Sequence, residues 1–329
     1  MRYLIYGQQG INDEVINHYL NIIKSAYGVV KKCNFVRVES VNDIADGDFV
    51  LLYTISDAFR VCLKKKIRYA IWMQGVYPEE RQLRGKGKID FALMSLIERQ
   101  ALSNAEKVFM VSKAMLTHYE KKYRLKLSHK TFIMPCYNCS INKDAFFVEQ
   151  KYDHPSFVYA GSLANWQCFD KTLLLFKKIN TIIPDAELYI YTKEKKKAED
   201  VAKRLEIKNY HIGYVKADDL NDAIKRCKYG FIIRDDITVN NVASPTKLSN
   251  YLSAGIIPVV SDAIVLYQEI ANESDYFVVE NNDESFVQSI INIEKKKIDP
   301  NSIYRDYNNL FDKYYNDNYY INSIEAFLV

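Results

Sequence analysis

Short runs of apolar residues alternate along the whole chain with longer stretches whose apolar positions recur every three or four residues. Runs of the first kind are typical of buried strands, and stretches of the second kind are typical of helices with one buried face. The alternation therefore predicts strand–helix units and parallel sheets. We expect strands at residues 2–6, 35–38, 49–53, 69–73, 107–111, 131–134, 157–160, 187–192, 210–213, 229–233, 257–260 and 276–279.

Helical patterns fill most of the gaps between these strands. We expect Asn12 to cap the first helix, and further helices over residues 89–103 and 283–294 and in the tail 302–328. The loop of residues 7–10, after the first strand, is predicted to form a wall of a cleft.

Residues 136–155 lose the alternation and gather Pro, Asn, Lys and Asp, which is typical of a domain boundary. A chain of 329 residues also suits two domains better than one. The pattern predicts an α/β protein of two doubly wound, Rossmann-like domains facing a central cleft. We expect the domains at residues 1–145 and 146–301, with a helical tail at 302–329 that packs back on the first domain.

The charge balance is close to neutral, with 45 Lys and Arg against 41 Asp and Glu, and does not by itself indicate a nucleic-acid partner. A basic cluster nevertheless lies in the first half of the chain, and it fits either a solvated face or contact with an anionic membrane. Its members are Arg81, Arg84, Lys86 and Lys88.

The first residues do not form a signal peptide, and no apolar run reaches the roughly 18 residues of a spanning helix. We therefore expect a cytoplasmic protein, with the basic cluster allowing contact with the inner face of the cell membrane. The six cysteines are scattered apart from Cys136 and Cys139, whose spacing we interpret as coincidence, and no histidine has metal-site spacing. No metal is expected.

Residues 243–262 predict a helix entrance suited to an anion. Ser244 is a suitable N-cap, Pro245 suits the first helical position, and Gly255 can end the helix before a buried strand. A positive charge in the first turn opposes the helix dipole, so Lys247 does not stabilise the helix. Beside the free backbone N–H groups, it would help to bind a phosphate. The alternative is a solvent-exposed lysine.

Arg234 follows the apolar run 229–233, and ligands of open α/β sheets gather at the carboxyl ends of strands. Together with Lys247 and the helix start, it would supply the cations and donors that a diphosphate needs. The alternative is that Arg234 pairs with Asp235 or Asp236 at the surface.

The two predicted domains and the signature SPTKLxxYLxxGxxPVV at residues 244–260 resemble family-4 glycosyltransferases of the GT-B fold. The likeness is strongest to bacterial enzymes that build capsular or other surface polysaccharides. It extends to FVYAGS at residues 157–162, to Trp166 and Gln167, and to Ser112, which opens a helix.

The resemblance implies transfer of a sugar from a nucleotide diphosphate donor to a glycan or lipid-linked acceptor, with retention of anomeric configuration and no metal cofactor. The donor would lie on the second domain, with the base beside Tyr214 and Val215 and the loop of Gly161 and Ser162 close by. Gly161 either forms an ordinary turn or lets the backbone approach the donor. Tyr214 either stacks on the base or packs on its own domain. The diphosphate would meet Arg234, Ser244, Pro245, Thr246 and Lys247.

The chain departs from the family pattern at several positions. Two glutamates seven apart in many members are Ala243 and Asn250 here, and the amide of Asn250 can still bind ribose hydroxyls. Ser162 replaces a common arginine, for which Arg234 can compensate. Lys171 is either a lysine behind the Gly161 loop or, as we favour, a surface residue.

On the acceptor side, residues 72–80 resemble a motif in which a glycine turn leads to an acidic residue, here Glu80. A carboxylate facing the cleft could hold or deprotonate an acceptor hydroxyl, or Glu80 is a surface residue. The catalytic candidates are Glu80, Arg234 and Lys247. Alternative functions are a catalytically inactive nucleotide-binding subunit of a transferase complex, a sugar-nucleotide epimerase and a basic adaptor.

Overall fold

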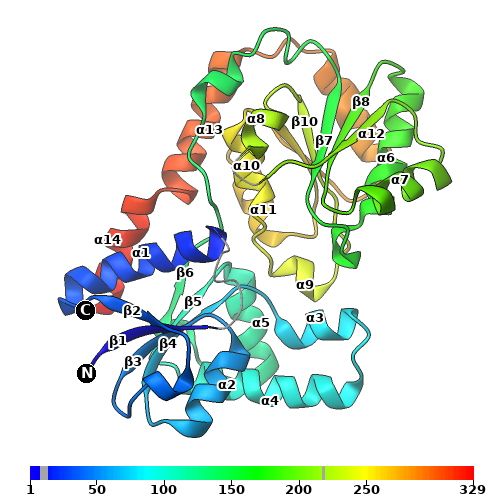
Figure 1. The fold of residues 1–329 in the computed structure, drawn as a ribbon. Helices are drawn as coiled ribbons and strands as arrows, with labels where there is room; N and C mark the ends of the chain where they lie inside the picture. Colours follow the sequence, from blue (N-terminus) through cyan, green and yellow to red (C-terminus); the bar gives the residue numbers. More distant parts are fainter. Residues whose placement is uncertain (8–13, 217–218) are drawn as a thin grey trace. The chain divides into compact units, whose positions relative to one another are not determined.

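The computed structural model describes residues 1–7, 14–216 and 219–329, which form two compact units (Figure 1). Unit 1 comprises Met1–Asn138, Asn241–Ser244 and Asn316–Val329, and unit 2 comprises Cys139–Asn240 and Pro245–Tyr315. The predicted cap Asn12 and most of the predicted cleft-wall loop 7–10 lie outside the described residues.

Unit 1 contains a six-stranded sheet in the order β2-β1-β3-β4-β5-β6, and all described pairings are parallel. Its strands are β1 (Tyr3–Tyr6), β2 (Phe35–Val38), β3 (Phe49–Leu52), β4 (Arg68–Met73), β5 (Lys107–Met110) and β6 (Thr131–Ile133). Its α-helices are α1 (Glu14–Lys31), α2 (Ile55–Lys64), α3 (Tyr77–Leu83), α4 (Lys88–Asn104), α5 (Lys113–Tyr123) and α14 (Asp317–Leu328).

Unit 2 contains a second parallel sheet in the order β12-β11-β10-β7-β8-β9. Its strands are β7 (Ser156–Ala160), β8 (Glu187–Tyr191), β9 (Tyr210–Gly213), β10 (Tyr229–Ile232), β11 (Ile257–Ser261) and β12 (Val278–Glu280). Its α-helices are α6 (Phe169–Ile182), α7 (Lys195–Arg204), α8 (Leu220–Ile224), α9 (Thr238–Asn241), α10 (Lys247–Ser253), α11 (Val265–Ala271), α12 (Asp283–Glu294) and α13 (Pro300–Tyr314).

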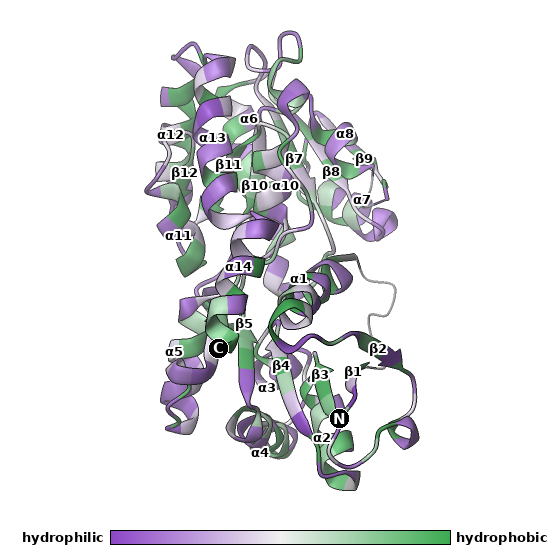
Figure 2. Ribbon diagram, turned by 90° about the vertical axis from the view of Figure 1, so that its left-hand side faces the viewer, coloured by the Kyte–Doolittle hydropathy of each residue, from purple (hydrophilic) through white to green (hydrophobic). Residues whose placement is uncertain are grey.

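The central strands are apolar and buried on both faces, as parallel sheets covered by helices require. Every residue of β3, β10 and β11 is buried, and Figure 2 colours β3 and β5 as hydrophobic segments inside unit 1. In each sheet the strand order reverses once, between β1 and β3 and between β7 and β10. Such switch points open a crevice beyond the carboxyl ends of the strands, where ligands bind in this kind of sheet.

All twelve predicted strands are present, with ends within two residues of the prediction. The unit boundaries differ from the predicted domain limits at residues 145 and 301. The chain leaves unit 1 after Asn138, Asn241–Ser244 return to it, and the helical tail is divided, with α13 in unit 2 and α14 in unit 1.

Helix α14 packs on α1 in unit 1. Tyr320, Ile324 and Leu328 of α14 are buried. Two lysines of unit 1 bind its last carbonyls, because Lys107 Nζ lies 2.8 Å from the oxygen of Phe327 and Lys31 Nζ lies 3.2 Å from that of Leu328. These lysines suit a helix C-terminus, where carbonyls lack partners within the helix.

Deletion of residues 316–329 should lower the free energy of unfolding of unit 1 by about 5 kcal/mol or more, since burying each large apolar side chain is worth about 1.5–3 kcal/mol. Urea denaturation followed by circular dichroism measures the change. Deletion of Val329 alone, a fully exposed residue, is the control and should leave the midpoint unchanged. An unchanged midpoint for the longer deletion would contradict the packing of α14.

Candidate functional site

Helix α10 carries the predicted anion-binding lysine, but it begins later than expected. It starts at Lys247 with Thr246 in the cap position, and no side chain caps it. Ser244 was predicted as the N-cap, and this is wrong because its Oγ accepts a hydrogen bond from the backbone N–H of Cys136 at 2.9 Å. Pro245 therefore precedes the helix. Gly255, at φ +66°, follows the end of the helix as predicted.

The ring of Tyr251 fixes α10 on the second sheet. It lies over Gly230 of β10, where an added Cβ would stand 2.5 Å from the ring. Its hydroxyl lies 3.3 Å from the backbone nitrogen of Ala160 and 3.4 Å from the carbonyls of Val158 and Phe231. Because Lys247 precedes Tyr251 by about one turn, this packing brings Lys247 to the carboxyl end of β7.

Lys247 is held in the protein rather than extended into solvent, so the alternative of a solvent-exposed lysine is wrong. Its Nζ lies 2.7 Å from Oε1 of Gln167 and 4.3 Å from the centre of the Tyr159 ring. Gly161, at φ +140°, passes so close that an added Cβ would stand 2.7 Å from the Cε of Lys247. Only glycine suits both this backbone conformation and this approach.

Arg234 follows β10 and is only 5% exposed. Its Nη1 donates to the carbonyl of Trp166 at 3.0 Å, and its backbone N–H donates to Ser261 Oγ at 2.8 Å. The alternative of a surface pair with Asp235 or Asp236 is wrong. Asp235 instead pairs with Lys171, whose side chain is 62% exposed, so the interpretation of Lys171 as a surface residue is confirmed.

Two cations therefore share the switch point of the second sheet without a neutralising carboxylate. Neither Arg234 nor Lys247 forms a salt bridge with any carboxylate in the described part of the chain. Burial lowers the pKa of both groups, and the positive charge of Arg234 lowers the pKa of Lys247 further. An anion bound here would favour the charged form of both side chains.

A cavity of about 560 Å³ opens at the carboxyl ends of β7, β8 and β9. The sequence predicted four of its lining residues, Gly161, Ser162, Tyr214 and Val215, and the structure brings them together. Gly161 also touches Lys247, so it connects the cavity with the cations. Tyr214 is 47% exposed, so an aromatic face is available to a ligand.

Three residues of this region were missed by sequence reasoning. Tyr191 and Glu194 line the cavity, and the Glu194 carboxylate accepts a hydrogen bond from the backbone of Leu163 at 2.6 Å. Tyr159 lies beside the ammonium of Lys247. The signal for Glu194 was its position just beyond a predicted strand, the same rule that identified Arg234.

Asn250 is not among the described residues that line the cavity. It is buried in unit 2, and its amide nitrogen lies 3.4 Å from Asn221 Oδ1 and 3.7 Å from Cys139 Sγ. Ala243 belongs to unit 1.

Glu80 lines a separate cavity of about 220 Å³ in unit 1, beside the ends of β3 and β4. Its Oε1 lies directly above Gly75, where an added Cβ would stand 2.1 Å from it. Burial raises the pKa of Glu80, although Arg84 at 3.5 Å opposes that shift. A carboxyl with a raised pKa at a cavity wall is suited to proton transfer or to holding a hydroxyl.

The neighbouring Glu79 has a structural environment. Burial would raise its pKa, but hydrogen bonds from His118 at 3.1 Å and Lys122 at 2.9 Å lower it overall. Lys122 also pairs with the buried Glu98. This network joins α3, α4 and α5 and leaves Glu80 as the carboxylate that faces the cavity.

The basic cluster is partly neutralised within unit 1. Arg81 makes two bonds to Asp90, at 2.8 and 2.5 Å, and Arg84 faces Glu80. Two members of the predicted basic cluster therefore have acidic partners, and the choice between a solvated face and a membrane contact stays a prediction. Lys86 and Lys88 are exposed.

Across the described ranges, no three His, Cys, Asp or Glu side chains gather in a way that could hold a metal ion. Cys136 lies in unit 1 and Cys139 lies in unit 2. No helix among the described residues is both long enough and apolar enough to cross a membrane.

Several solved structures share this fold at low sequence identity. Sucrose-phosphate synthase from Thermosynechococcus elongatus has a TM-score of 0.69 at 10% identity, with 98% of this chain and 97% of that one covered. HepE from Anabaena, solved with UDP and glucose, has a TM-score of 0.68 at 11% identity, with 100% and 99% covered.

TarM from S. aureus, solved with UDP among other ligands, has a TM-score of 0.66 at 9% identity. The match covers 87% of this chain but only 56% of TarM, so the chain spans little more than half of that relative. A search of curated protein sequences gave no match.

The fold is thus that of GT-B proteins, with two parallel α/β units. The family model described as "Glycosyl transferases group 1" matches residues 141–308, slightly more than half of the 329 residues. That match includes Gly161, Arg234 and Lys247, and the chain belongs to the group 1 glycosyltransferases.

Proposed function

We propose that the protein transfers a sugar from a nucleoside diphosphate donor to an acceptor hydroxyl, with retention of anomeric configuration and without a metal. The observation that carries this proposal is the pair of cations at the switch point of the second sheet, buried Arg234 and half-buried Lys247, beside the cavity at the carboxyl ends of β7, β8 and β9. A diphosphate carries the negative charge that would neutralise these two cations.

In the proposed reaction the bond between the anomeric carbon and the distal phosphate oxygen breaks, and the acceptor oxygen forms the new bond to that carbon. The acceptor proton leaves to the departing diphosphate, and Glu80 holds the acceptor hydroxyl. Negative charge on the leaving group grows as the bond breaks, so Arg234 and Lys247 stabilise the transition state more than the ground state.

The cavity lined by Tyr191 and Tyr214 is proposed to hold the nucleoside. Its volume of about 560 Å³ lies in the usual range for small-molecule sites, about 300–1,000 Å³. Aromatic faces bind any base by stacking, and backbone groups of the Tyr214–Val215 loop would select among bases. HepE and TarM were solved with UDP, which makes a uridine nucleotide the first candidate.

The proposed acceptor is a glycan or lipid-linked saccharide of a bacterial surface polysaccharide, met at the inner face of the cell membrane. One support is the fold of WaaB, described as a lipopolysaccharide outer core galactosyltransferase, with a TM-score of 0.64 at 11% identity. The other is the Glu80 cavity of unit 1, which is separate from the cation site of unit 2.

A second candidate is a nucleotide-binding subunit without catalytic activity. The observation in its favour is that Ala243 and Asn250 replace carboxylates that the family resemblance would place near the donor. Both candidates bind nucleotide, so turnover distinguishes them. Release of nucleoside diphosphate from a donor would support the enzyme, and tight binding without release would support the subunit.

A nucleoside diphosphate should raise the melting temperature, and one base among UDP, GDP, CDP, ADP and dTDP should do so most. Saturation at about 100 times Kd adds roughly 2.7 kcal/mol of stability. Arg234→Ala and Lys247→Ala should each weaken binding about 10- to 100-fold, through loss of a charge-assisted contact worth roughly 1.5–3 kcal/mol. EDTA should change nothing. Lys171→Ala, which removes an exposed cation, is the matched control. Wild-type responses from both cation variants would refute the donor site.

Lys247→Met should stabilise the empty protein while removing the response to nucleotide. The pKa of Lys247 is lowered on folding, so the folded state loses stability as the pH falls below the unfolded value of about 10.4. We expect a gain on the order of 1 kcal/mol at pH 7, or about 2–4 °C in Tm, that shrinks toward pH 10. Lys195→Met, at the exposed first residue of α7, should show no such trend. A pH-independent difference would contradict the burial of the Lys247 charge.

Glu80→Gln should keep donor affinity and lose transfer by about 100-fold or more, as expected for a group that acts on the acceptor proton or hydroxyl. Because burial raises the pKa of Glu80, the ionised group costs folding energy at pH 7, so the variant should be no less stable than wild type. Gly75→Ala should reproduce the loss by displacing the carboxylate. Full turnover by Glu80→Gln would return Glu80 to a structural role.

A further inference from the structure

Helix α4 turns an apolar stripe away from the protein. Ile89, Leu93 and Leu96 are 89%, 52% and 63% exposed, and their spacing places them on one side of the helix. The opposite side is also in use, because Glu98, Ala101 and Leu102 are buried. A helix packed on one side normally presents polar residues on the other, so the stripe is not needed for folding.

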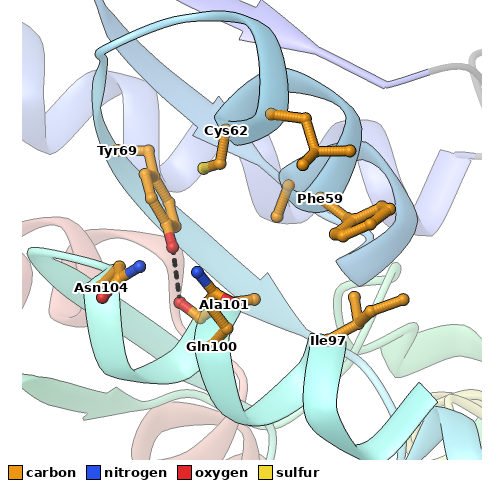
Figure 3. A pocket seen from close by; sticks show the side chains of 9 residues that line it. Phe59, Cys62, Tyr69, Ile97, Gln100, Ala101 and Asn104 are labelled. Carbon is orange, nitrogen blue, oxygen red and sulfur yellow. Dashed lines mark hydrogen bonds between the residues drawn. The ribbon is translucent and has the colours of Figure 1, made fainter. Parts of the chain in front are cut away.

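Exposed apolar side chains also lie on α2, which packs on α4. Phe59 and Leu63 are 41% and 69% exposed, and they line a small pocket of about 60 Å³ together with Ile97 of α4. Figure 3 shows Phe59 and Ile97 at one end of that pocket, with the hydrogen bond from Tyr69 to Ala101 at its floor. We call the five exposed side chains the apolar surface of unit 1: Phe59, Leu63, Ile89, Leu93 and Leu96.

The charges next to this surface are positive. Lys86 and Lys88 directly precede the stripe and are exposed, and Arg99 is exposed on α4 itself. The carboxylates of α4 offset these charges only in part, because Asp90 near Lys86 is already bound to Arg81 and Glu98 is buried beside Lys122. Positive charge therefore predominates at the border of the apolar surface.

We propose that the apolar surface docks on an anionic lipid bilayer. The leucine and isoleucine side chains enter the boundary between headgroups and acyl chains, and Lys86 and Lys88 bind anionic headgroups. A symmetric second copy fits less well, because a two-fold interface would bring the lysines of both copies together. Paired Arg81 and Arg84 contribute little to this attraction.

The docking surface lies next to the acceptor-side cavity along the chain. Glu80 stands on α3, and the loop with Lys86 joins α3 to α4. If the proposed function holds, docking would present this cavity to an acceptor carried on a lipid. Docking itself depends only on the apolar surface and its lysines.

The test uses the whole protein in flotation with vesicles of phosphatidylcholine alone or mixed with phosphatidylglycerol, at low and high salt. Wild type should bind the anionic vesicles at low salt. Lys86→Gln with Lys88→Gln should weaken this binding about tenfold or more, and the difference should shrink at high salt. Ile89→Gln, Leu93→Gln and Leu96→Gln together should weaken binding at both salt concentrations, and circular dichroism should show the helix content of wild type.

Matched controls lie in unit 2. Leu174→Gln with Ile182→Gln changes two exposed apolar residues of α6, and Lys195→Gln with Lys196→Gln changes two exposed lysines of α7. Both pairs should bind vesicles as wild type does.

Wild-type binding by the apolar or the lysine variant would overturn the proposal, as would failure of the wild-type protein to float with anionic vesicles. A change from dimer to monomer in the apolar variant, with no vesicle binding by wild type, would assign the surface to a second copy instead. Nucleotide-dependent melting of the same samples separates the two hypotheses. An intact nucleotide response without flotation refutes docking alone, and flotation without a nucleotide response refutes the donor site alone.

Discussion

The stacking of Tyr251 on Gly230 is the contact on which the candidate donor site depends. The fully buried ring of Tyr251 packs α10 against the sheet. Its hydroxyl contacts backbone atoms at three positions of β7 and β10. Any side chain at residue 230 would lift the helix. The height of α10 above β10 sets the distance between Lys247 and the Gly161 loop, so the packing of an uncharged ring positions a charged group.

That arrangement has an energetic cost for the empty protein. Arg234 and Lys247 are desolvated, and the charge of Arg234 raises the cost of ionising Lys247. Hydrogen bonds to the Trp166 carbonyl and to Gln167 offset part of the cost. Under the proposed function, a bound anion would recover the rest, so the site would trade stability in the free state for affinity toward charged ligands.

The repeated apolar pattern was sufficient to predict the strands, because parallel strands covered on both faces need uninterrupted apolar runs. Arg234 was identified through its position at a strand end. Lys247 was identified through its place in the first turn of a predicted helix, and the Gly161 loop through the family resemblance. Sequence reasoning failed at Ser244, whose side chain bonds to Cys136 far along the chain. A cap preference is local, and such a distant partner overrides it. The ion pair of Arg81 with Asp90 was missed for the same reason, since the pattern of charges does not show which side chains meet.

The split of unit 1 among three chain segments has a consequence for synthesis. Residues 316–329 are synthesised only after all of unit 2, so the part of α1 that packs on α14 stays uncovered until then. Contacts between residues so distant in sequence form slowly, and uncovered apolar faces promote aggregation in the meantime. Unit 2 is therefore expected to be the early-folding part of the nascent chain, and completion of unit 1 to be the step most dependent on chaperones.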